Sequence, residues 1–84
     1  MENAMKIKTA NGKELNCDFC VESTSTNRLY IHFTDISFLE LIPIISDKSA
    51  LPMEGYEEYV ELESISDSPD GVNVDLRKKT EVTA

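Results

Sequence analysis

The sequence predicts an α+β fold: a small antiparallel sheet, in the element order β-β-β-α-β-β, with one short helix packed on a face. Two turn signals indicate the sheet, because an Asn-Gly pair at 11–12 and a Pro-Asp-Gly run at 69–71 each adjoin segments that alternate apolar and polar residues. A capping signal indicates the helix, since Ser37 is followed three residues later by Glu40. The chain has 84 residues, which favours one domain.

We place this single domain at residues 5–79. Apolar residues occur there in organised runs, which argues against disorder of the whole chain. Residues 1–4 are interpreted as a flexible leader and residues 80–84 as a flexible tail.

Composition limits what the domain can do. The net charge is −8, and residues 35–75 hold eleven acidic residues and one basic residue, Lys48. Such a surface opposes direct contact with nucleic acid, whose phosphates need basic partners. The acidity is typical of solubility or of binding to a basic partner. No apolar run approaches the ~20 residues that span a bilayer. We therefore expect a cytoplasmic protein without membrane contact.

The first hairpin is predicted to turn through a three-residue loop, with Gly12 left-handed in a bulge. This loop pairs Ile7 with Leu15 and Met5 with Cys17, and it keeps one face apolar. The expected inner face holds Met5, Ile7, Leu15, Cys17, Phe19 and Val21.

A third strand is predicted at residues 28–33, antiparallel to the second. Leu29, Ile31 and Phe33 lie on one of its faces, and Tyr30 and His32 on the other.

The helix is expected to start after the N-cap residue Ser37 and to end near Ser46. Its buried face is predicted from spacings of three and four residues. This face comprises Leu39, Ile42 and Ile45, with Phe38 as an additional candidate. Pro43 removes a helical hydrogen bond, so we expect a short, kinked or interrupted helix. A fully irregular segment is the alternative.

The second hairpin is predicted to join a strand over residues 60–65, bulged near Tyr59, to the alternating segment that follows Gly71. A three-residue loop places Glu63 opposite Arg77 and Glu61 opposite Lys79. The many Glu residues of this segment also favour a helix, but the following segment needs a partner strand.

The C-x-x-C pair of Cys17 and Cys20 lies within a predicted strand, so the two thiols are expected on opposite faces. A redox pair needs a helix start after a strand, and a zinc site needs four convergent ligands. Cys20 and His32 can both face outward, yet no third orienting group is evident. We therefore predict no enzyme, and no catalytic, metal or cofactor residues. A mixed site of Cys17, Cys20, His32 and Asp35 is a remote alternative.

The candidate residues for binding are aromatic and acidic. Tyrosine suits contact surfaces, and acidic neighbours would favour a basic partner. The candidate interface consists of Tyr30, Tyr56, Tyr59, Glu57, Glu61 and Glu63. Alternatively, two of the tyrosines cover the edges of a small core.

Four segments together carry a resemblance: "MKIKTANGKEL", "LYIHFTDISFLELIPIIS", "YEEYVELESI" and "GVNVDLRK". Over nearly all of residues 5–79 the chain resembles small uncharacterised proteins encoded in phages and prophages of Gram-positive gut bacteria. It departs from them at Pro43, where they continue a helix. The resemblance implies an accessory or virion-associated role in a bacterial host, and it offers no site residues.

Three functional hypotheses follow. The first is a non-enzymatic phage or prophage protein that acts through protein–protein contacts, including self-association through edge strands. The second is an acidic decoy or inhibitor that binds a basic partner in the manner of a nucleic-acid mimic. The third and most remote is a small metal or thiol site made of Cys and His residues.

Overall fold

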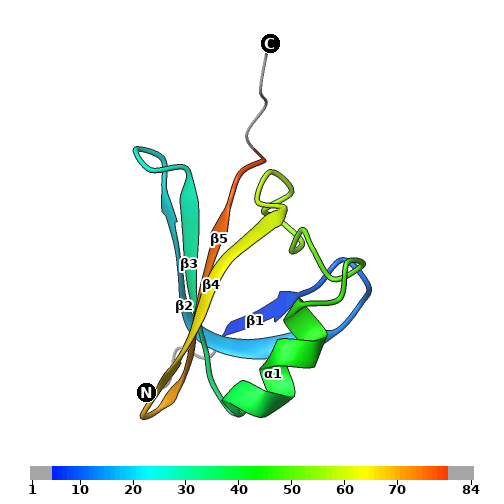
Figure 1. Cartoon of the computed structure of the whole chain (residues 1–84), viewed down its shortest axis with the longest axis vertical. Helices are drawn as coiled ribbons and strands as arrows, with labels where there is room; N and C mark the ends of the chain where they lie inside the picture. Colours follow the sequence, from blue (N-terminus) through cyan, green and yellow to red (C-terminus); the bar gives the residue numbers. More distant parts are fainter. Residues whose placement is uncertain (1–4, 80–84) are drawn as a thin grey trace.

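The computed structural model describes residues 5–79 and shows a five-stranded antiparallel sheet with one helix (Figure 1). The predicted α+β class and element order are confirmed. The elements are β1 (Met5–Lys8), β2 (Glu14–Ser23), β3 (Arg28–Phe33), α1 (Phe38–Ile45), β4 (Glu61–Ser68) and β5 (Gly71–Arg77). The strand order is β1-β2-β3-β5-β4. The predicted leader and tail lie outside the described residues.

The first hairpin has the predicted register. Met5 pairs with Cys17 and Ile7 with Leu15. The Thr9 N–H donates to the Lys13 carbonyl at 2.8 Å, which closes the three-residue loop. Gly12 has a φ of 95°, the left-handed conformation that glycine adopts at low cost.

The predicted inner face of β2 is wrong beyond Cys17. A β-bulge leaves Asp18 without a partner, between the Cys17–Phe33 and Phe19–His32 pairs. An extra residue reverses the alternation of side chains along a strand. The side chains of Phe19 and Val21 are therefore 43% and 52% exposed. The predicted inward Met5, at the start of β1, is also exposed.

The core lies on one side of the sheet, which we call the inner face; the opposite side is the outer face. Figure 1 shows α1 on the inner face, with the long strand β2 curving beneath it. The sheet contributes Ile7, Leu15, Cys17, Leu29, Ile31, Phe33, Val72, Val74 and Leu76 to the core. The helix and the segment after it add Leu41, Ile45, Met53 and Tyr59.

Helix α1 has the predicted capping box and ends at Ile45, with Ser46 as its C-cap, close to the predicted end. It is short, as expected, and runs over eight residues despite Pro43. Pro43 has no N–H to donate to the Leu39 carbonyl, which therefore loses its helical hydrogen bond. Both residues are exposed, so water can solvate that carbonyl.

The predicted buried face of α1 is partly wrong. Leu39 is 79% exposed, whereas Leu41 and Ile45 are buried. Phe38, the additional candidate, packs against the core with Leu41 and Ile45, and their spacings of three and four residues fit a helix face as well as the predicted spacings do. Spacing alone could not separate the two faces.

The second hairpin forms, but its predicted register is wrong by one residue near the turn and by two residues beyond the bulge. The loop has two residues, because Ser68 pairs directly with Gly71. Glu61, and not Glu63, is opposite Arg77. The bulge lies between Leu62 and Ser64 and not near Tyr59.

The two edges of the sheet differ. At β1, the Ala10 N–H donates to the Ala50 carbonyl and the Glu54 N–H donates to the Lys8 carbonyl, both at 2.8 Å. The loop over residues 50–54 therefore covers the Lys8 end of that edge and the turn that follows it. At β4, no loop within residues 5–79 makes such backbone hydrogen bonds.

None of the helices in the described part of the chain is long and apolar enough to cross a membrane.

Candidate functional site

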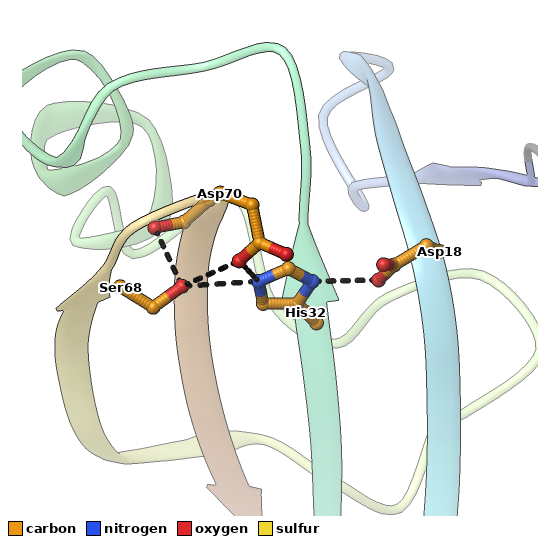
Figure 2. A network of polar contacts seen from close by, with 5 residues as sticks. Asp18, His32, Ser68 and Asp70 are labelled. Carbon is orange, nitrogen blue, oxygen red and sulfur yellow. Dashed lines mark hydrogen bonds and ion pairs between the residues drawn. The ribbon is translucent and has the colours of Figure 1, made fainter.

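A polar network surrounds His32 on the outer face of the sheet (Figure 2). The residue is only 5% exposed, although no helix covers this face. Its Nδ1 atom lies 2.6 Å from Asp18 Oδ1, and its Nε2 atom lies 3.1 Å from Ser68 Oγ. The prediction that His32 faces outward is confirmed, but it is buried and not a surface residue.

Three elements bring these side chains together. His32 comes from β3, and the unpaired bulge residue Asp18 comes from the neighbouring strand β2. Ser68 ends β4, and the turn after it carries Asp70. Figure 2 shows Asp18 on one side of the imidazole ring and the turn residues on the other.

Two close contacts hold the ring in place. The Phe19 ring stacks on it, with centroids 5.4 Å apart and an angle of 14° between the planes. Gly71 lies beneath it, and a Cβ added there would overlap the Phe33 carbonyl oxygen and lie 2.9 Å from His32 Nε2. Glycine at this position lets the turn approach the ring.

Ser68 has several polar neighbours. Its Oγ lies 3.3 Å from Asp70 Oδ1, and it lies 3.2 Å from the Gly71 carbonyl oxygen, which can accept from it. Asp70 Oδ1 is also 3.4 Å from His32 Nε2. Asp70 is 81% exposed, whereas the Asp18 side chain is half-exposed.

The arrangement supports proton transfer. When the His32 Nδ1–H donates to Asp18, the Nε2 lone pair can accept the Ser68 hydroxyl proton. A carboxylate that orients an imidazole, which in turn contacts a hydroxyl, is the relay that activates serine nucleophiles. When both ring nitrogens are protonated, the same ring can donate to Asp18 and to Asp70.

An open groove lies beside Ser68, between the β4–β5 turn and the start of α1. Its lining includes Asp35, Ser37 and Phe38 on one side and Asp67 and Asp70 on the other. Three carboxylates thus border the groove.

The two cysteines do not have the predicted opposed faces. The bulge at Asp18 turns Cys20 back toward the core, where it is half-buried, while Cys17 is buried. Both thiols are free. Burial raises the pKa of each thiol, which disfavours the reactive thiolate.

The predicted outward pair of Cys20 and His32 is also wrong. Cys20 pairs with Ile31 and shares its face, so His32 lies on the other side of the sheet. A contact with Tyr56 lowers the thiol pKa but does not outweigh burial. Residues 5–79 contain no group of three or more His, Cys, Asp or Glu side chains that could hold a metal ion.

The structure does not bring the predicted interface tyrosines together. Tyr59 is buried, and its hydroxyl donates to Glu22 Oε2 at 2.7 Å. Burial, followed by that hydrogen bond, raises the pKa of Tyr59 to about 12. Tyr56 is half-buried against the core, and its hydrogen bond to Cys20 raises its pKa to about 12. Tyr30, on β3, is half-buried on the outer face, across from Val21.

The predicted interface glutamates have partners within the chain. Arg77 Nε lies 3.0 Å from Glu61 Oε1 and 3.3 Å from Glu63 Oε1. Arg28 also contacts Glu63, at 3.6 Å. Glu57 accepts from the Gly55 N–H at 2.9 Å. The charge of the acidic stretch is therefore partly neutralised near β4.

Sequence reasoning missed the His32 network. The one sequence signal for this network was the Ser-Pro-Asp-Gly turn at 68–71. This turn places a hydroxyl and a carboxylate beside the strand that pairs with β5. That strand is β3, and the pairing sets His32 opposite Asn73, two residues from Gly71. Neither this pairing nor the Asp18 bulge follows from local turn chemistry.

Comparisons of the chain with protein-family models, with curated protein sequences and with solved structures gave no match, so the functional argument rests on this geometry.

Proposed function

We propose that this chain is a non-enzymatic protein that acts through protein–protein contacts, with the open edge of β4 as the contact and a second copy of the chain as the occupant. The supporting observation is the difference between the two sheet edges. Loop 50–54 forms backbone hydrogen bonds with Lys8, at the end of β1, and with Ala10 in the turn after it, whereas no described loop forms such bonds with the eight-residue edge strand β4. Such edges pair readily with another strand.

The hairpin geometry indicates which backbone groups are available. The pair that closes a two-residue hairpin, here Ser68 and Gly71, is hydrogen-bonded, and hydrogen-bonded and non-hydrogen-bonded pairs then alternate. Ile65 and Asp67 therefore direct their N–H and C=O groups toward the free edge.

The strand is suited to pairing with itself. An antiparallel pair centred on Ile65 sets Ile65 opposite its own copy on the inner face and Ser64 opposite Ser66 on the outer face. The same register sets Asp67 near Glu63 of the second copy. That repulsion is reduced because Glu63 already contacts Arg28 and Arg77. We expect weak association that strengthens as salt screens the remaining charge.

The resemblance to phage and prophage proteins supports a setting for this contact. We place the protein in the cytosol of a bacterial host or on the virion, as an accessory component. Two free thiols are consistent with a reducing compartment.

Sedimentation over a wide concentration range tests the proposal with two variants of one exposed position. Asp67→Thr removes a charge and adds a strand-forming residue, so it should strengthen association. Asp67→Pro removes an N–H that points away from β5, so it should abolish association and leave the fold intact.

The proposal fails if the wild type and Asp67→Thr are both monomers at every concentration and salt level. A monomer that binds polylysine in a salt-sensitive way would support the acidic decoy instead.

A further inference from the structure

We propose that Ser68 is a nucleophile, activated by His32 and Asp18, that accepts an acyl group from an ester. This reaction is independent of the β4 edge contact proposed above. It rests on the ordered contacts from Asp18 Oδ1 to His32 Nδ1, at 2.6 Å, and from His32 Nε2 to Ser68 Oγ, at 3.1 Å. These three groups match the roles that serine activation requires: the Asp18 carboxylate orients the ring, His32 acts as the base, and Ser68 supplies the hydroxyl.

Two other serines on β4 allow the contacts of Ser68 to be compared with those of residues on the same strand. Ser64, Ser66 and Ser68 alternate along β4 and share the outer face. Among the described residues, only Ser68 of these three contacts an imidazole. The burial of His32 and the stacked Phe19 ring keep that base in one orientation.

The proposed step balances in protons and electrons. The Ser68 oxygen attacks the ester carbonyl carbon while His32 Nε2 takes the hydroxyl proton. The tetrahedral intermediate then collapses, the bond to the leaving oxygen breaks, and that oxygen takes the proton from His32. The products are an acylated Ser68 and a free alcohol or phenol, so the reaction is a single modification of Ser68 without turnover, which agrees with a non-enzymatic role.

The groove beside Ser68 limits the acyl donor. Asp35, Asp67 and Asp70 border it, so an anionic ester would be repelled. We therefore assign neutral or cationic esters as the substrate class. Asp70 also competes for the Ser68 hydroxyl, at 3.3 Å, and for His32 Nε2, at 3.4 Å. Removal of its charge should increase the reactivity of Ser68.

The test is acetylation by p-nitrophenyl acetate, a neutral activated ester, with each serine monitored by peptide mass spectrometry. Ser68 should be acetylated about 100-fold faster than Ser66, the size of contribution typical of a positioned base. Asp18→Asn and His32→Asn should each lower the Ser68 rate at least about tenfold. Asp70→Asn should raise it, and Ser66→Ala should leave it unchanged.

Circular dichroism identifies variants that keep the fold, and only these are compared. Equal acetylation of Ser66 and Ser68 in the wild type would overturn the proposal, and this measurement needs no variant. An unchanged Ser68 rate in folded Asp18→Asn, whose altered side chain is half-exposed, would also overturn it.

Discussion

Two residues that are adjacent in sequence, His32 and Phe33, are both buried but on opposite faces of β3. Phe33 lies in the apolar core, on the face that α1 covers. His32 has no helix above it and is buried by Phe19, Gly71 and its polar partners. The inner face thus gains stability from apolar area, whereas the outer face uses hydrogen bonds and one aromatic stack to enclose a polar residue.

The largest expected difference between the two faces is in the free energy of unfolding that is lost when a phenylalanine is replaced by alanine. Phe33→Ala should lower the free energy of unfolding by about 3–5 kcal/mol, because it leaves a cavity in the core. Phe19→Ala should lower it by only about 1 kcal/mol, because Phe19 is 43% exposed and loses mainly its stack on His32. Urea unfolding of both variants gives the comparison. Equal losses would mean that the outer face also relies on apolar burial.

A second comparison uses two glycines. Gly71→Ala should cost about 3 kcal/mol, since the added methyl group meets the rigid Phe33 carbonyl and the His32 ring. Gly55→Ala, the control, should cost about 1 kcal/mol, because its φ of 89° is strained for alanine but its surroundings are open. If the two costs were the same, the close approach at His32 would not be needed.

The smallest expected effect on stability at neutral pH concerns the two tyrosines that pack on the core, Tyr56 and Tyr59. Their folded-state pKa values are about 12, compared with 10.0 for the free side chain, so the unfolded chain ionises first. Their contribution to stability is complete below pH 10 and is lost as the pH rises toward 12. Tyr59→Phe should make the unfolding free energy less dependent on pH in that window. Unfolding curves at pH 9, 10 and 11 would show this, and an unchanged slope would contradict it.

Short-range turn and capping signals correctly predicted the first hairpin and the start of the helix. Gly12 and its three-residue loop set the first hairpin register, and Ser37 with Glu40 set the start of α1. The turn at 69–71 was identified correctly, but its loop was predicted to be one residue too long. Gly71 belongs to β5, where it packs against β3.

The errors came from bulges and from equivalent periodicities. The extra residues Asp18 and Glu63 each shift a strand by one position, and their side chains give no sign of it. The true helix face and the predicted one both have spacings that fit one side of a helix, so spacing could not choose between them. The His32 site was out of reach because it combines a bulge with a pairing between non-consecutive strands, β3 and β5.

The bulge at Asp18 adds one residue to β2 that the strand pairing itself does not use. Loss of that single residue would make the Cys17–Phe33 and Phe19–His32 pairs consecutive in an unbroken ladder, so Phe19 and Val21 would still face outward and Cys20 would still face the core. The same deletion would remove the carboxylate that contacts His32. A one-residue deletion in β2 could therefore abolish the polar site and still preserve the strand pairing and the orientation of the thiol.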